Sequence, residues 1–178
     1  APPRGGTAPG VVDGYGSGDA SMDPGMSVGR LSLLDRGFVF ASAHVRGGGE
    51  LGRHWYDEGK MLHKRNTFTD FISSARLLLD GGWTSANRLI AEGGSAGGLL
   101  MGAIANLAPD TFAGIVAAVP FVDNLTTNLA TNLPLAVIQR AGLGHPLEHV
   151  ACYASLKSYP PYSICGATSA PGILTLTR

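Results

Sequence analysis

The spacing of hydrophobic positions changes several times along the chain and divides residues 37–120 into alternating strands and helices. Short runs rich in apolar residues at 37–43, 88–92 and 114–120 predict strands. Apolar residues recur at helical spacing from Phe68 to Leu79, and an apolar helix is predicted from 98 to about 107. Strands that alternate with helices in this way are typical of a parallel α/β sheet.

The flanking regions give weaker patterns. We expect residues 1–10 to be disordered or extended, and residues 11–178 to form a single α/β domain. Within it, 11–13 resembles the end of a strand, 27–35 a short helix and 173–177 a strand. Thr67 and Asp70 fit a capping box at the start of the long helix. Beyond about residue 136 the pattern weakens, and 139–146 has no clear period.

Composition excludes several classes of protein. The chain has 178 residues with 13 basic and 13 acidic side chains, so no cationic face for nucleic acid is indicated. No apolar run is long enough to span a bilayer, and the first residues do not resemble a signal peptide. No group of His, Cys and Asp has the spacing of metal ligands. Two free thiols, Cys152 and Cys165, are favoured over a single disulfide.

The most informative motif is Gly93-Gly94-Ser95-Ala96-Gly97, which fits the pattern Gly-x-Ser-x-Gly. In serine hydrolases this pattern forms a tight turn between a strand and a helix, and the turn projects the serine as a nucleophile. The strand predicted before Ser95 and the helix predicted after it agree with this interpretation. A plain glycine-rich turn is the alternative.

A serine nucleophile needs an imidazole base and an acid that orients the base. In α/β-hydrolases these residues follow the serine in the order acid, then histidine. Asp123 with His145 or His149 satisfies that order. However, Asp123 follows the next strand after Ser95, and too few strands remain to return a histidine to Ser95. A strand-end or capping role for Asp123, and loop positions for both histidines, are the favoured interpretation.

Other polar residues near the predicted strands are interpreted as structural. His44 and Arg46 follow the strand 37–43, where α/β sheets bind ligands. We expect Arg46 to hold its glycine-rich loop by binding nearby backbone carbonyls. The loop 50–56 is expected to be scaffolding, and the basic run from Lys60 to Arg65, with His63, a solvated face.

Several ordered segments together resemble the catalytic domain of the prolyl oligopeptidase family, and most closely its oligopeptidase B branch. The likeness runs from about Tyr15 to Leu135 and rests on segments at 33–39, 44–52, 64–71, 93–100 and 119–123. The resemblance implies an α/β-hydrolase fold, a mostly parallel sheet flanked by helices. It also implies a serine-type oligopeptidase that cleaves short peptides after Arg or Lys and needs neither a metal nor an organic cofactor. Members of the family are mostly cytosolic, so a cytoplasmic location is expected.

The resemblance also implies roles for individual residues. Ser95 matches the nucleophile, and the amide of Ala96 and the hydroxyl of Tyr15 match the two donors to the oxyanion. Asp23 matches one acid of a pair that contacts a basic side chain of the substrate. The second acid of that pair would fall at Gly25, which weakens the expected preference for dibasic substrates.

Three departures from the family pattern limit what is expected of this chain. The chain is expected to lack the β-propeller that precedes the catalytic domain in relatives. Gln139 and Ala141 occupy the positions of two glutamates that bind Arg or Lys, within a segment (136–156) whose altered sequence suggests a frameshift or real divergence. The acid and histidine of the triad are expected beyond Arg178. We therefore expect a C-terminally truncated domain with poor activity, or alternatively a non-catalytic remnant that only binds peptide or a partner domain.

Overall fold

A computed structural model describes residues 8–130, 133–159, 161 and 171–177 of the chain. Five parallel strands form one sheet in the order β2-β1-β3-β4-β5. Their bounds are β1 Gly10–Gly14, β2 Val39–Ala43, β3 Leu89–Gly94, β4 Gly114–Ala118 and β5 Gly172–Leu176. The expected parallel α/β sheet flanked by helices is confirmed, and β1 begins at Gly10, the last residue of the segment 1–10 that was expected to be disordered or extended. Residues 1–7 lie outside the described residues.

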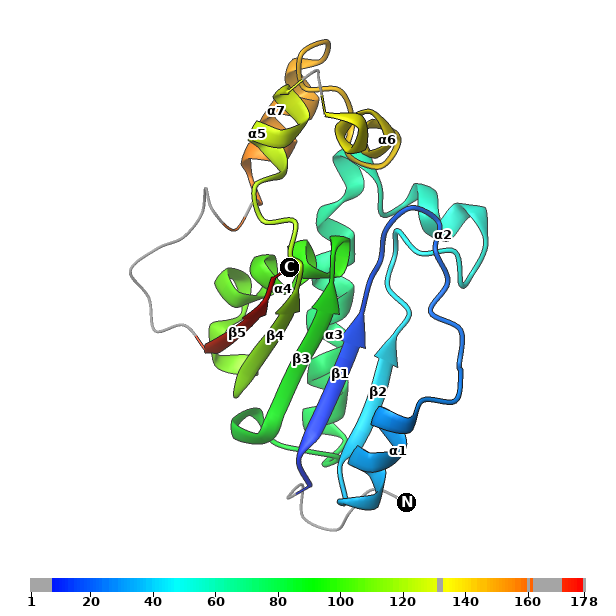
Figure 1. Ribbon diagram of the computed structural model, residues 1–178, viewed down its shortest axis with the longest axis vertical. Coiled ribbons are helices and arrows are strands. Elements are labelled where there is room, and N and C mark those ends of the chain that lie inside the picture. Colours follow the sequence, from blue (N-terminus) through cyan, green and yellow to red (C-terminus); the bar gives the residue numbers. More distant parts are fainter. Residues whose placement is uncertain (1–7, 131–132, 160, 162–170, 178) are drawn as a thin grey trace.

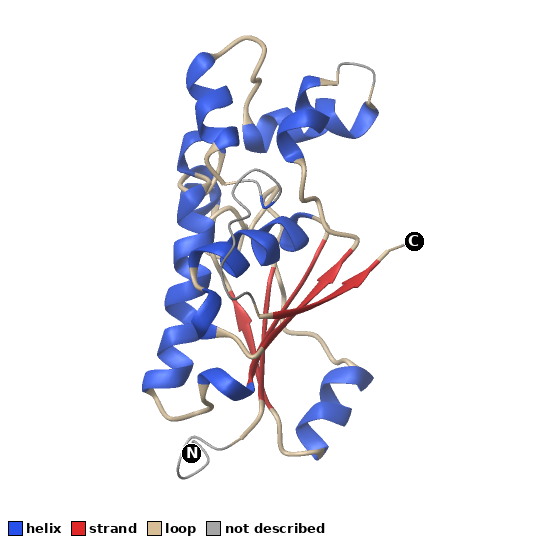
Figure 2. Cartoon of the chain, turned by 90° about the vertical axis from the view of Figure 1, so that its left-hand side faces the viewer, coloured by secondary structure: helices blue, strands red, loops and turns tan. Residues whose placement is uncertain are grey.

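Helices cover the sheet as the strand order requires. The chain passes from β1 to β2 at the edge of the sheet and then returns past β1 to β3 and β4. Crossovers between parallel strands are right-handed. The helix that connects β1 to β2 therefore lies on the face opposite to the helices of the later crossovers. Helix α1 (Val28–Asp35) lies on one face, whereas α3 (Arg65–Asp80) and α4 (Ala96–Leu107) pack together on the other (Figure 2). The strand order reverses between β1 and β3, and ligand sites in open α/β sheets lie at such a reversal.

The core fills the face covered by α3 and α4. Phe68 and Phe71 of α3 and Leu100 of α4 are fully buried there, with Val12 of β1 and Ala91 of β3. Leu100 also lies close to Gly14 at the end of β1. This packing fixes the ends of β1 and β3 relative to the helices, which positions the loops that follow both strands.

Four further helices lie outside this central arrangement. They are α2 (Arg53–Asp57), α5 (Asn124–Leu129), α6 (Pro134–Leu143) and α7 (Val150–Lys157). Helices α5, α6 and α7 gather beyond the carboxyl ends of the strands (Figure 1). None of the four was predicted from the sequence. In the part of the chain that the structure describes, no helix has both the length and the apolar character needed to cross a bilayer.

The opposite face of the sheet is only partly covered. Asp13 and Glu92 are neighbours in register across β1 and β3, and Arg30 of α1 reaches Asp13 at 3.4 Å. Burial, and then the charge of Glu92, raise the pKa of Asp13 above its usual value, against the lowering effect of Arg30. Leu174 and Leu176 of β5 are about half exposed on the same face.

Two local predictions from the sequence are wrong. The long helix begins at Arg65 rather than Thr67, and no side-chain cap bond is formed at its start, so the expected capping box is absent. Lys64 belongs to the basic run that was expected to be solvated, but only 2% of it is exposed. Both errors concern the start of α3, where side chains hold the loops described below.

Candidate active site

Ser95 occupies a tight turn between β3 and α4, as the motif predicts. Its backbone has φ 55° and ψ −112°, a combination that L-residues rarely adopt. The Ser95 amide donates to Ala118 O at 2.9 Å, and Ser95 O accepts from Phe121 N at 3.2 Å. Hydrogen bonds to the last residue of β4 and to the segment after it therefore hold the strained residue, and its side chain remains exposed at the carboxyl edge of the sheet.

Two glycines make this turn possible because other backbone segments pass close to them. A Cβ atom on Gly93 would lie 2.6 Å from Gly97 O, and one on Gly97 would lie 2.6 Å from Gly14 O. Both positions therefore exclude any side chain. The close approach also brings the loop after β1 against the start of α4. That loop contains the next candidate residue, Tyr15.

Tyr15 follows β1 directly and lies beside the turn. A Cβ on Gly97 would lie 3.6 Å from Tyr15 Cα and from its ring, so this residue packs against the first turn of α4. The amide of Ala96 is the first of that helix and has no acceptor within the helix, whereas the amides of Gly98 and Leu99 donate to Ser95 O. The loop after β1 and the start of α4 thus meet at the reversal in strand order.

A buried lysine holds the loop that carries Tyr15. Lys64 Nζ donates to Gly16 O at 2.6 Å, and burial lowers the pKa of Lys64 to about 7. No other described charged group is among the causes of this shift. The lysine therefore ties the start of α3 to the residue directly after Tyr15.

Arg46 and α3 hold the neighbouring loop. The Arg46 guanidinium donates to both oxygens of Asp70, at 2.7 and 2.6 Å, and Thr67 Oγ1 donates to Arg46 O at 2.6 Å. The structural role expected for Arg46 agrees with this geometry, but its partner is a carboxylate rather than backbone carbonyls. Asp70 and Thr67, which were predicted to cap the helix, instead anchor this loop.

A pocket of about 400 Å³ opens beside Ser95 and has two walls. We call the first the sheet wall: it comes from the loops after the strands and from α4, and comprises Tyr15, Ser17, Gly18, Ser95, Ala96, Leu99 and Phe121. The second, the α6 wall, comprises Gln139, Ala141, Gly142 and Leu143, and Tyr56 of α2 lies between the two. The structure therefore brings Ser95, Ala96 and Tyr15 together on one side of a cavity.

None of the five histidines lines this pocket, although all five lie in the described part of the chain. Asp123 caps α5 and accepts from Thr126 N at 3.1 Å, which is the capping role favoured from the sequence. His145 lies 3.7 Å from Glu148, and His149 precedes α7 at the surface. The alternative triad of Ser95 with Asp123 and either histidine is not assembled.

Sequence comparison identifies the family. A profile of the prolyl oligopeptidase family matches residues 24–176. The chain belongs to the prolyl oligopeptidase family. Members of this family are serine peptidases, as the motif at Ser95 indicated.

Individual relatives support the same assignment. The chain is 48% identical to Protease 2 of Moraxella lacunata and 47% identical to dipeptidyl aminopeptidase BI of Pseudoxanthomonas mexicana, over 97% and 98% of its length. The structure of oligopeptidase B from Leishmania major matches with a TM-score of 0.91 and 45% identity over 95% of the chain. The chain spans about a quarter of the length of these relatives: 25%, 24% and 23%.

Asp23, the remaining site residue expected from the prolyl oligopeptidase family, lies apart from the pocket. Its side chain is exposed on the loop between β1 and α1, and it is not among the residues that line the cavity. The adjacent residue is held in place, since His44 Nε2 lies 3.1 Å from Met22 O and Glu50 accepts from Met22 N at 3.0 Å. The loop therefore presents Asp23 to solvent.

Several residues of the pocket could not be identified from the sequence. Tyr56 and Phe121 were not assigned to it, and no helix was predicted at α6. Two signals could have located α6: Pro134 occupies its first turn, and Gly144, with φ 87°, ends it. A helix between these residues presents Gln139 and Ala141 toward Ser95.

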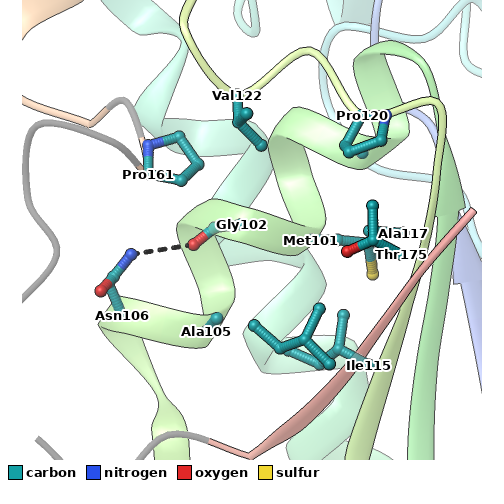
Figure 3. A pocket seen from close by; sticks show the side chains of 12 residues that line it. Met101, Gly102, Ala105, Asn106, Ile115, Ala117, Pro120, Val122, Pro161 and Thr175 are labelled. Atoms are coloured by element: carbon teal, nitrogen blue, oxygen red, sulfur yellow. Dashed lines mark hydrogen bonds between the residues drawn. The ribbon is translucent and has the colours of Figure 1, made fainter. Parts of the chain in front are cut away.

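A second pocket, of about 220 Å³, lies between α4 and strands β4 and β5. Its described lining is apolar apart from Asn106 and Thr175, and Asn106 donates to Gly102 O of its own helix at 3.0 Å (Figure 3). Pro161, which also lines the pocket, lies against Gly102. Because the pocket offers no nucleophile or charged group among these residues, the site at Ser95 is the better candidate for chemistry.

Proposed function

We propose that this chain carries the nucleophile and oxyanion donors of a serine peptidase that cleaves short peptides through an acyl-enzyme on Ser95. The observation that carries the proposal is the strained backbone of Ser95 between β3 and α4, beside a pocket that also contains Tyr15 and Ala96. Strain of this kind is stored at functional sites, because the surrounding hydrogen bonds must maintain it.

Each residue has a defined role in the proposed reaction. Ser95 Oγ loses its proton to a base and bonds to the peptide carbonyl carbon, whose oxygen becomes an oxyanion. The Ala96 amide and the Tyr15 hydroxyl donate hydrogen bonds to that oxygen. The C–N bond then breaks, and the leaving amine takes the proton from the base. Water next gives a proton to the base and bonds to the acyl carbon, the bond from that carbon to Ser95 Oγ breaks, and the base returns the proton to Oγ.

The base is not supplied by the residues that line the pocket, since none of them is a histidine. Loss of the base or its acid lowers kcat by about 10⁴- to 10⁶-fold in serine proteases. We therefore expect this chain, expressed alone, to hydrolyse peptides very slowly. The same absence favours peptide binding without turnover as a second function of the chain by itself.

The names of the relatives support peptides as substrates but differ in the preference that they state. They include a dipeptidyl aminopeptidase, an oligopeptidase B and prolyl endopeptidases. These names therefore do not decide whether this protein prefers to cleave after Arg or Lys, as the family resemblance implies. Asp23 is a candidate for contact with a basic residue of the peptide, at a position outside the pocket. A β-propeller that restricts access to short peptides is likewise proposed for the whole protein.

A fluorophosphonate probe with mass spectrometry tests the proposal. We expect slow labelling of Ser95 in the folded chain, none after heat denaturation, and none in Ser95→Ala. Ser73→Ala, an exposed serine on α3, serves as the matched control and should label like the parent chain. Labelling spread over many serines, or unchanged in Ser95→Ala, contradicts a nucleophilic Ser95. Peptide binding without any labelling supports the second function.

A further inference from the structure

We propose that the pocket beside Ser95 takes a long uncharged side chain of the peptide in preference to Arg or Lys, and that Gln139 contributes a hydrogen-bond acceptor to this selection. The inference rests on the proposed function, because it assumes that the pocket receives the residue whose carbonyl Ser95 attacks. It concerns which peptide binds, whereas the proposed function concerns the reaction at Ser95.

The pocket lacks the negative charge that a buried Arg or Lys side chain needs. The chain has 13 Asp and Glu residues, and all of them lie among the described residues. None of them lines the pocket. Burying a cation without a paired anion costs far more than burying a neutral side chain of the same shape.

The carboxylates that are closest in sequence to the pocket lining are already paired. Asp19 lies 3.3 Å from Arg53, and Asp57 lies 2.6 Å from Lys60 and 3.4 Å from Arg53. The hydrogen bond from Lys60 lowers the pKa of Asp57 below its usual value. These carboxylates therefore pair with basic side chains of the protein itself.

Positive charge lies close to the pocket. The Arg53 guanidinium is 4.6 Å, and the Lys60 ammonium 4.7 Å, from the centre of the Tyr56 ring, which lines the cavity. Arg140 lies next to Gln139 in α6, and its Nε atom is buried without a hydrogen-bond partner among the described residues. Asp19 and Asp57 already offset the charges of Arg53 and Lys60, so a further cation in the pocket would find no unpaired anion among these groups and would be repelled by Arg140.

The lining instead suits a neutral chain with an N–H donor at its end. Tyr15, Tyr56, Phe121 and Leu143 contribute apolar surface. Gln139 Oε1 is buried and accepts no hydrogen bond from the described residues. A ligand that donates to this oxygen removes the cost of an unpaired buried acceptor. A volume of about 400 Å³ accommodates an extended side chain.

Four acetyl-dipeptide aldehydes that differ only in the last residue test the inference. Arginine and citrulline form one pair of similar shape, and lysine and norleucine form the other, so that each pair isolates the charge. Dissociation constants are measured by NMR titration of the 178-residue chain and of Ser95→Ala. We expect citrulline to bind at least about tenfold more tightly than arginine, norleucine more tightly than lysine, and citrulline the most tightly of the four, in both proteins.

Charge-introducing variants sharpen the test. Gln139→Glu should reverse the preference within each pair, and Ala141→Glu, at an exposed position of the same wall, provides a second variant if the first does not fold. Gln139→Met, which removes the amide without adding charge, should weaken citrulline binding and leave norleucine binding within about twofold.

The outcomes separate the two proposals. Tighter or equal binding of the basic aldehydes, or binding of none of the four, overturns the inference about the pocket. Equal affinity of each aldehyde for the parent chain and for Ser95→Ala means that no hemiacetal forms, which counts against the nucleophile and leaves the preference for neutral side chains standing.

Discussion

The sheet wall and the α6 wall of the Ser95 pocket differ in how they are held. Behind the sheet wall, Lys64 donates a hydrogen bond to Gly16 O, and the backbone of Ser95 forms hydrogen bonds with Ala118 and Phe121. In the α6 wall, Gln139 and its neighbour Arg140 each keep a buried polar atom without a partner among the described residues. Satisfied networks fix one geometry, whereas unpaired groups are available to a ligand. The difference suggests that the sheet wall positions the groups that react and that the α6 wall selects the side chain of the peptide.

The largest effect is expected where the sheet wall contacts the reacting atoms. Tyr15→Phe removes the proposed second oxyanion donor, and removal of one such donor costs on the order of 10²- to 10³-fold in rate. We expect the rate of fluorophosphonate labelling of Ser95 to fall by about that factor. Tyr153→Phe, at the surface of α7, is the control and should label at the parent rate. A Tyr15→Phe chain that labels normally would remove Tyr15 from the proposed chemistry.

A smaller effect is expected from the residue that holds the sheet wall. Because burial lowers the pKa of Lys64 to about 7 from an ordinary 10.5, the unfolded chain binds more protons between these values. The parent chain should therefore gain stability as pH rises, by roughly 2 kcal/mol between pH 7 and 9 relative to Lys64→Met. Below pH 7 the two curves should run parallel.

Chemical denaturation at several pH values measures this difference. Lys157→Met, which changes an exposed lysine of α7, should give a curve parallel to that of the parent chain throughout. If the curves of unfolding free energy against pH are parallel for Lys64→Met and the parent from pH 7 to 9, then the pKa of Lys64 is not lowered and Lys64 is not buried in solution.

The smallest effect is expected at the α6 wall. Tyr56 OH donates to Ala141 O at 3.4 Å, a long hydrogen bond that links α2 to α6. Tyr56→Phe should lower the free energy of unfolding by about 0.5–1 kcal/mol and change the labelling rate of Ser95 less than about threefold. A loss of labelling as large as that of Tyr15→Phe would show that the two walls are not separable in this way.

The sequence was sufficient to predict the turn at Ser95 and the strands around it, because their signals are local. The turn at Ser95 follows from glycines that lie next to it, and the strands follow from short apolar runs. Tyr15 was identified only through the family resemblance, since a tyrosine after a glycine in a loop has no distinctive pattern of its own.

The contacts that hold the site could not be predicted, because they join distant residues. Lys64 and Gly16 are 48 positions apart, and Arg46 and Asp70 are 24 apart. A lysine within a basic run is normally solvated, and only the fold shows that this one faces the end of β1. Helix α6 was missed for a different reason: residues 139–146, which run past its end, have no clear period, although a proline and a glycine mark the ends of the helix.

The central claim is that Ser95 is a nucleophile that this fold holds ready beside its oxyanion donors. The most direct test is ¹¹B NMR of the 178-residue chain with a short peptide boronic acid that ends in the norleucine analogue, since boron changes from trigonal to tetrahedral when an alkoxide adds to it. The account predicts a tetrahedral signal with the parent chain and a trigonal signal with Ser95→Ala. Trigonal boron in both proteins would contradict it.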